Sequence, residues 1–530
     1  MFKSFQRDFQ VLFILLIGSL LLTGCDINKA KDAFNKVSLV IGLKPITTTV
    51  SGQFLDGKTG DLIQNVTVKF IGNDAGDVID MFSDPLSQQT FKGGFATFGI
   101  NNNLTPSSSS PVTFTVVAQA PGYVTAYKKV TLTSTDHFSF VATMANKNNL
   151  PPGTSTGSNN SATAGSNGTV SQGYSVQTTS NSGSTSNASM SVPSNTIMTD
   201  ASGNPLSGTL TSQMIYFNGD STKAIHQIPG GSDDGSISTG FAQIKITDAS
   251  GKKAAKFSKP VTIHSEVSSS FINPATGNPV KNGDSLEVQS YNENTGQWKK
   301  EGMAVLKGPN NGGNYDVYFQ ISHLSFWKFI LPKVKLTKNG ATINIQRNGN
   351  DGVLTGDAST YGYTLNFSVP ANINKIMLPQ SIGLEYIPEI TANITLNGIS
   401  GGVTQKINLG SGSYNFNLPA PSGNKIDVTF NLVPKCSDTS KKVHVTSIPT
   451  SEVYYQQTGP EWIDAGQPDW NFDKNTSVLS GGTLTVNGLI QGKTYTFKTA
   501  FDGKTYTKVI NITSKKMTVS QVISGGYCKK

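Results

Sequence analysis

Short runs in which apolar and polar residues alternate recur along most of this 530-residue chain, and they constrain its fold more than any other feature. The clearest of these runs are 66–70, 114–117, 244–246, 261–263, 343–345 and 495–497. Such alternation predicts strands with one buried face, and Gly, Asn and Asp turns between strands are typical of β-sandwiches. Helical periodicity is nearly absent after residue 40. We therefore predict an all-β fold of several tandem sandwich domains.

The N-terminal segment has a different character. Lys3 and Arg7 precede an apolar stretch over residues 11–22, which is shorter than the roughly 20 residues that a membrane-spanning helix needs. A positive start, a short apolar segment and small residues before a break are typical of a bacterial export signal. The sequence therefore predicts a protein that leaves the cytoplasm.

The residues Leu22-Thr23-Gly24-Cys25 resemble the lipobox of bacterial lipoproteins. The resemblance implies that residues 1–24 are a cleaved signal peptide, that 25–45 are a membrane tether, and that Cys25 carries the lipid. Several acyl chains make a durable anchor, because each buried methylene contributes about 0.8 kcal/mol. The expected partner is thus a membrane. Asp26 resembles the inner-membrane retention signal of enteric lipoproteins, but that rule does not extend to other phyla, and we favour the outer membrane or cell surface.

The net charge of +9 does not indicate a nucleic-acid partner. The lysines are scattered, and the sequence contains neither a basic helix nor an aromatic-basic RNA motif. The same positive charge would also favour non-specific binding to anionic lipid or polysaccharide. A charge that only keeps the protein soluble is an equally good explanation. We therefore expect no nucleic-acid binding, and a glycan or another envelope protein stays open as a partner.

Residues 46–145 resemble the carboxypeptidase regulatory-like and Cna B-type modules. The matching residues are Val50, Gly52, Asp56, Thr59, Gly60, Ile63, Asn65, Val66 and Val68 at the start, and Ala120, Gly122 and Tyr123 near the end. The resemblance implies a prealbumin-like sandwich that serves as a spacer or as a sugar- or protein-binding unit. Some Cna B domains carry a Lys–Asn isopeptide bond. Lys69 is the candidate lysine, but Gln119 lies where an acid would be expected, so we assign no such bond.

Residues 146–173 are rich in Gly, Ser, Asn and Thr, and Leu150 and Val170 are their two large apolar residues. This composition is typical of a flexible linker, which at this length would span roughly 30 Å. The sequence predicts that proteases cut here first.

Residues 174–331 resemble a β module found in bacterial surface lipoproteins and in cartilage intermediate layer proteins. Three blocks carry the resemblance: Val192, Pro193, Asp200, Gly203, Pro205 and Gly208; Tyr291, Asn292, Glu293, Gly296, Trp298 and Gly302; and Ser322, His323, Ser325 and Trp327. The regular spacing of short predicted strands further indicates an Ig-like domain over 332–434. Residues 435–530 are predicted to form a fibronectin-like domain, whose closing hairpin resembles that of fibronectin-type repeats.

Motifs that suggest catalysis have simpler explanations in this chain. A G-x-S-x-G match at 153–157 falls in the predicted linker, whereas a nucleophile elbow needs a strand before it and a helix after it. A GDSL match at 283–286 is followed by a strand pattern and by no D-x-x-H, so Asp284 and Ser285 are predicted turn residues. The five histidines are dispersed. We therefore expect no catalytic residues, metal or cofactor.

Aromatic residues in the last domain suggest a binding site. Trp462 and Trp470 flank a polar Gly/Pro-rich segment near Tyr454 and Tyr455, and exposed rings can stack on the apolar faces of sugars. The alternative is that a tryptophan fills the sandwich core.

The sequence as a whole suggests three functions, in order of preference: a non-enzymatic binding or structural lipoprotein, a carbohydrate-binding accessory lipoprotein of a glycan-uptake system, and a secreted hydrolase with an unrecognised site.

Cys436 and Cys528 are the two remaining cysteines. Export would place both in a compartment where disulfides persist, and strands that begin and end a sandwich can lie close together. The alternatives are that both thiols are free, or that the two cysteines bind a metal with His444 as the only nearby histidine. We predict a Cys436–Cys528 disulfide.

Overall fold

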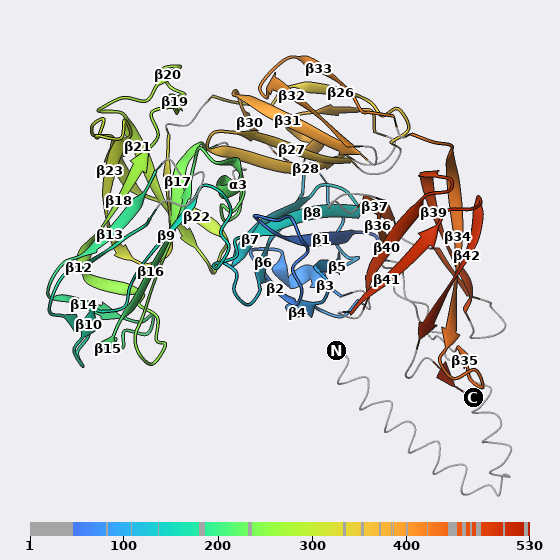
Figure 1. Cartoon of the computed structure of the whole chain (residues 1–530), viewed down its shortest axis with the longest axis horizontal. Coiled ribbons are helices and arrows are strands. Elements are labelled where there is room, and N and C mark those ends of the chain that lie inside the picture. Colours follow the sequence, from blue (N-terminus) through green and yellow to red (C-terminus); the bar gives the residue numbers. More distant parts are fainter. Residues whose placement is uncertain are drawn as a thin grey trace, which may run out of the picture.

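The computed structural model describes residues 46–530 with interruptions, and its described residues form four β-sandwiches in chain order (Figure 1). The interruptions are 81–82, 108, 136, 180–185, 232–235, 332–334, 351–353, 370–372, 383, 385, 399–400, 421, 444–452, 458–462, 467–468, 473–478, 502–503, 524–527 and 530. The predicted all-β fold is confirmed. The signal peptide, the tether and Cys25 lie outside the described residues.

The first sandwich packs two four-stranded sheets over one apolar core. One sheet has the strand order β3-β5-β1-β8 and the other β4-β2-β6-β7. Their bounds are β1 (Thr49–Asp56), β2 (Val66–Ile71), β3 (Val78–Ile79), β4 (Gln88–Phe91), β5 (Phe95–Ile100), β6 (Val112–Gln119), β7 (Ala126–Leu132) and β8 (His137–Met144), with a 3-10 turn η1 (Ala75–Asp77). Tyr123 Oη donates to Asp56 Oδ2 at 3.0 Å. Two residues of the module resemblance thus serve a structural contact.

The second sandwich has two six-stranded sheets, which we name by their surroundings. The seam sheet has the order β22-β21-β24-β17-β16-β9 and faces the first sandwich; the outer sheet has the order β11-β14-β18-β13-β12, with β23 also paired to β18. Their bounds are β9 (Thr154–Asn159), β11 (Thr169–Val170), β12 (Tyr174–Gln177), β13 (Ala188–Val192), β14 (Thr196–Thr199), β16 (Thr211–Asn218), β17 (Ser238–Thr247), β18 (Lys256–Val267), β21 (Ser285–Asn292), β22 (Gln297–Val305), β23 (Tyr315–His323) and β24 (Phe326–Ile330).

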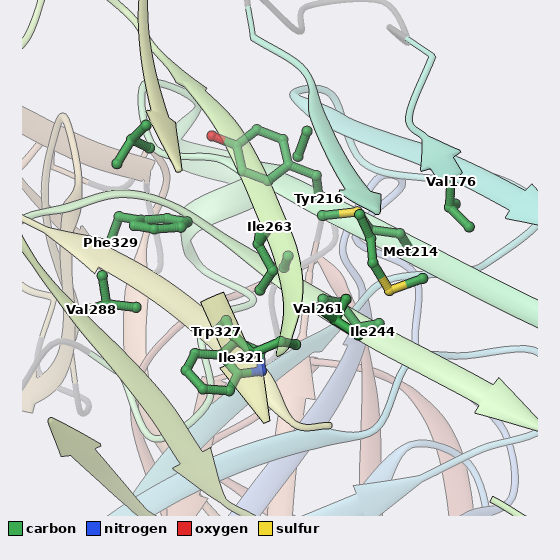
Figure 2. Close-up of a cluster of buried hydrophobic side chains, with 14 of the residues drawn as sticks. Val176, Met214, Tyr216, Ile244, Val261, Ile263, Val288, Ile321, Trp327 and Phe329 are labelled. Atoms are coloured by element: carbon green, nitrogen blue, oxygen red, sulfur yellow. The ribbon is translucent and has the colours of Figure 1, made fainter. Parts of the chain in front are cut away.

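Small elements and a large core complete this second sandwich. Trp327 of the predicted closing motif lies in the core beside Ile321, as Figure 2 shows, and is almost fully buried. The small elements are β10 (Thr163–Ala164), β15 (Gly208–Thr209), β19 (Ile272–Asn273), β20 (Asn278–Pro279) and the helix α3 (Thr222–Ile225), which Ser221 caps.

The third and fourth sandwiches follow the same plan with smaller sheets. The third contains β25 (Leu336–Thr337), β26 (Thr342–Gln346), β27 (Leu354–Thr360), β28 (Tyr363–Val369), β29 (Lys375–Met377), η2 (Gln380–Ile382), β30 (Ile387–Pro388), β31 (Thr391–Gly398), β32 (Gly401–Asn408) and β33 (Ser413–Asn417). The fourth contains β34 (Lys425–Cys436), β35 (Lys442–Val443), β36 (Val453–Gln456), β37 (Ile463–Gly466), β38 (Asp469–Phe472), β39 (Leu479–Ile490), β40 (Thr494–Phe501), β41 (Lys504–Asn511), β42 (Lys516–Ile523) and β43 (Cys528–Lys529).

The boundary expected at 434/435 is wrong, because it would cut β34 near its end. This strand pairs with both β39 and β42 of the fourth sandwich, and Phe430 lies in the core of that sandwich. The fourth domain therefore begins about ten residues earlier than the sequence predicts. A proline marked the expected boundary, but Pro434 lies within β34 itself.

The expected flexible linker at 146–173 is also wrong, because most of this segment belongs to the second sandwich. β9 pairs with β16 along its whole length, and β11 pairs with β14. Both large apolar residues of the segment are buried: Leu150 lies between the first two sandwiches and Val170 in the second core. Backbone pairing needs no large side chains, and two apolar anchors are enough to hold the segment.

Candidate functional site

An apolar seam joins the first and second sandwiches, and it is the most extensive interdomain contact that the described residues make through buried side chains. The first sandwich contributes Val117 of β6 and Tyr127 of β7. The second contributes side chains on the seam sheet, on α3 and just after α3, namely Ile215, Phe217, Ala224, Ile225, Ile228, Phe241, Tyr291 and Phe326. Together with Val124, Ala145 and Leu150, all of these are buried. The seam therefore has the character of a domain core rather than of a surface contact.

Aromatic rings dominate the seam. Phe217 and Phe241 stack with ring centroids 4.3 Å apart. Tyr127 meets the edge of Tyr291 at 5.0 Å. Aromatic pairs contribute roughly 0.5–1.5 kcal/mol beyond the burial of their area. This packing fixes the two sandwiches against each other.

Polar atoms at the rim of the seam are paired across it. Tyr127 Oη donates to Glu293 Oε2 at 2.9 Å, Gln227 Nε2 donates to Thr143 Oγ1 at 2.9 Å, and the backbone N–H of Gly230 donates to the Tyr127 carbonyl. Burial raises the pKa of Tyr127, and the nearby Glu293 carboxylate raises it further. The phenol therefore stays protonated and keeps donating. The seam thus combines an apolar centre with polar pairs at its rim, while the Tyr291 hydroxyl is buried there without a hydrogen bond among the described residues.

The third sandwich contacts the second through the turn between β27 and β28. The Gly362 N–H donates to the Gly219 carbonyl, and the Ser238 N–H donates to the Gly362 carbonyl, each at 2.8 Å. Gly362 has a φ of +72°, and an added Cβ would lie 2.4 Å from the Ser238 oxygen. Nε2 of His226, the C-cap residue of α3, lies 3.0 Å from Asp357 Oδ2 on β27. Only glycine fits at this turn.

The fourth sandwich returns to the first, which therefore lies in the middle of the molecule (Figure 1). The rings of Phe95 on β5 and Tyr454 on β36 are 4.9 Å apart, Lys498 Nζ lies 5.5 Å from the Phe95 ring, and Thr505 Oγ1 donates to the Lys92 carbonyl. β28 of the third sandwich also lies beside β8. The first sandwich thus contacts each of the other three.

The expected stacking site in the fourth sandwich is not formed by its tyrosines. Tyr454 is 1% exposed in the contact with Phe95, and Tyr455 is 2% exposed in the core. Neither ring can meet a ligand, because the neighbouring sandwich covers one and the core encloses the other. Trp462 lies outside the described residues. Trp470 lies on β38, whose side chains are not described.

Cys436 and Cys528 form the disulfide that the sequence predicts. Their Cα atoms are 5.7 Å apart, and the bond joins the end of β34 to β43, which pairs with β35. It ties down the C-terminal end of the fourth sandwich.

The described residues offer little that points to catalysis. No group of three His, Cys, Asp or Glu side chains able to hold a metal occurs among them. Asp284 Oδ2 accepts from the Lys281 N–H, and Ser155 is buried on β9, so both motifs serve the fold. In the part of the chain that is described, no helix is long and apolar enough to cross a membrane.

No protein-family model matches this chain, and no curated protein matches it. Among solved structures, it is similar to a leucine-rich repeat protein from Bacteroides thetaiotaomicron, with 11% identity, 36% of this chain and 27% of that one covered, and a TM-score of 0.15. BcpA, the major pilin subunit of Bacillus cereus, is 6% identical, with coverages of 90% and 98% and a TM-score of 0.15.

The T6 backbone pilin of serotype M6 Streptococcus pyogenes is 12% identical, with coverages of 91% and 98% and a TM-score of 0.13. The chain spans about a quarter of the length of the leucine-rich repeat protein. TM-scores this low carry no argument about function. The β-sandwich assignment therefore rests on the strands and cores described above, and the module resemblances stay predictions.

Proposed function

We propose that this protein is a lipoprotein of the bacterial envelope, anchored through Cys25, whose four sandwiches form a rigid, non-enzymatic structural or binding unit. The seam between the first two sandwiches is the observation that carries the rigid role. A protein that swings its domains would join them by a polar contact and a free linker, whereas here aromatic side chains and Leu150 are buried between them.

The anchor rests on the sequence. A basic start, an apolar segment and Leu22-Thr23-Gly24-Cys25 follow one another in the order that lipoprotein processing needs. A lipid on Cys25 would attach the chain at the end next to the first sandwich. Since that sandwich contacts the other three, the whole molecule would be held close to the membrane through its central domain.

Replacing the anchoring residue gives a direct test of this proposal. The substitution Cys25→Ala removes the thiol that would carry the lipid, so we expect an uncleaved precursor or a protein released from membranes by mild washing. Detergent-phase partitioning and intact-mass analysis of the membrane fraction measure both outcomes.

Ser19→Ala is the matched control, because it changes a small residue of the apolar segment and leaves the four lipobox residues intact. The control should partition into detergent like the parent. If Cys25→Ala were still processed and still partitioned into detergent, the lipoprotein assignment would be wrong.

A further inference from the structure

His323 lies at the edge of the second sandwich, where its two sheets approach each other. β22 is the last strand of the seam sheet, β23 pairs with β18 in the outer sheet, and β22 and β23 lie beside each other. Val317 and Ile321 of β23 lie in the core, where Figure 2 shows Ile321. Because alternate residues of a strand share a face, His323 points toward the core side of β23.

The imidazole of His323 contacts a buried indole. Its ring centroid lies 4.9 Å from that of Trp327, and the two rings are inclined by 50°. Trp327 is 1% exposed, and its Nε1 has no hydrogen-bond partner among the described residues. A cation over the face of an indole is attracted to it, but rings inclined at this angle are not stacked face to face. The indole therefore offers little to a charged imidazole.

The lack of a polar partner distinguishes His323 from two other histidines. His226 Nε2 lies 3.0 Å from Asp357 Oδ2, and His264 Nε2 lies 2.8 Å from Asp316 Oδ1. In the described part of the chain, the His323 side chain has neither a carboxylate at ion-pair distance nor a hydrogen bond. Protonation of His226 or His264 would strengthen an existing pair, whereas protonation of His323 would place a half-buried charge beside apolar rings.

The charged groups around His323 do not compensate for its burial. On β22, Lys299 Nζ and Glu301 Oε1 lie 3.2 Å apart as an ion pair. On β18, the exposed Lys256 is the register partner of His323, and on β24 Lys328 points away, because adjacent residues of a strand lie on opposite faces. Burial lowers the pKa of His323 more than the Glu301 carboxylate raises it, and Lys299 lowers it further.

The folded sandwich therefore favours the neutral imidazole. An unperturbed histidine has a pKa of about 6.5, so the unfolded chain takes up a proton near that pH, while folded His323 stays neutral until the pH is lower. The stability that neutral His323 contributes is thus present above about pH 6.5 and is lost as the pH falls below that value.

We infer that His323 is an acid-sensitive switch, whose protonation opens the edge of the second sandwich where β22, β23 and β24 meet. The switch goes beyond the proposed function and does not depend on the anchor at Cys25.

Hydrogen–deuterium exchange of the full chain at about pH 7.5 and about pH 5, on either side of the ordinary histidine pKa, tests this inference. Each rate is corrected for the intrinsic effect of pH on exchange. In the parent, peptides from β22, β23 and β24 should exchange at least about threefold faster at the lower pH, since a full pKa unit corresponds to about tenfold. Glu301 stays ionised over this range: burial opposes its ionisation, but the Ser290 hydroxyl and Lys299 lower its pKa.

Two variants remove the titrating group in different ways. His323→Phe keeps an uncharged ring against Trp327, and His323→Gln keeps a neutral polar side chain, so in both variants the acid-dependent increase in exchange should disappear. His264→Gln is the matched control, because it removes a partly buried histidine from the same sandwich, and it should keep the increase.

Four results would overturn the inference: no faster exchange of the parent at the lower pH, slower exchange there, an equal increase in the third sandwich, or an increase that both His323 variants retain.

Discussion

The substitution Phe217→Asp should destabilise the protein by more than about 4 kcal/mol, the range in which buried charges and large cavities fall. Phe217 is fully buried in the seam and stacks on Phe241. A carboxylate there would lose its hydration without gaining a cation. Urea unfolding followed by tryptophan fluorescence measures the change, because Trp298 and Trp327 both lie in the second sandwich.

Ile272→Asp is the matched control for this experiment. It makes the same kind of change in the same sandwich, but Ile272 is 50% exposed on β19, so the free energy of unfolding should change by less than about 0.5 kcal/mol. If both variants unfolded at the same urea concentration, Phe217 would not be buried between the two sandwiches.

Removing the disulfide should have the second largest effect. The double substitution Cys436→Ser and Cys528→Ser opens a loop of 92 residues. In the chain-entropy model, closing a loop of this length raises the free energy of unfolding by at most about 4 to 5 kcal/mol. We expect this loss in the fourth sandwich, because the bond joins two of its strands. Thermal unfolding of the two proteins measures the difference.

Thiol alkylation of the denatured, unreduced protein provides the independent check on the bond itself. Intact-mass analysis should find no label on Cys436 or Cys528 before reduction and two labels after it. Labels at both positions before reduction would show that the bond does not form in the isolated protein.

Alternation of apolar and polar residues was enough to predict the fold class, because each strand buries one face. Val261 and Ile263 illustrate this: both were predicted strand residues and both lie in the second core. Export and the positions of Cys436 and Cys528 near the start and end of the last domain were likewise sufficient to predict their pairing.

Contacts between domains could not be predicted in the same way, because they depend on which faces meet in space. Tyr454 looks like a ligand-binding residue among polar neighbours in the sequence, yet Phe95, more than 350 residues earlier, covers it.

The segment at 146–173 was wrongly predicted to be a flexible linker because it is rich in Gly, Ser, Asn and Thr. Gly157 shows why composition misleads here. An added Cβ would lie 2.1 Å from the Gln177 carbonyl oxygen, so this glycine permits close strand packing rather than flexibility. Thr154 and Ser155 are buried on the same strand.

Limited proteolysis of the full chain with proteinase K tests the central claim most directly, namely that the first two sandwiches form one rigid unit. Cleavage needs locally unfolded backbone, and β9 is paired along its length with β16. The account predicts that the bonds between residues 150 and 170 stay intact while the first fragments appear, so that both sandwiches remain in one fragment in mass spectrometry. Early cleavage within 150–170 that yields two separate resistant domains would contradict it.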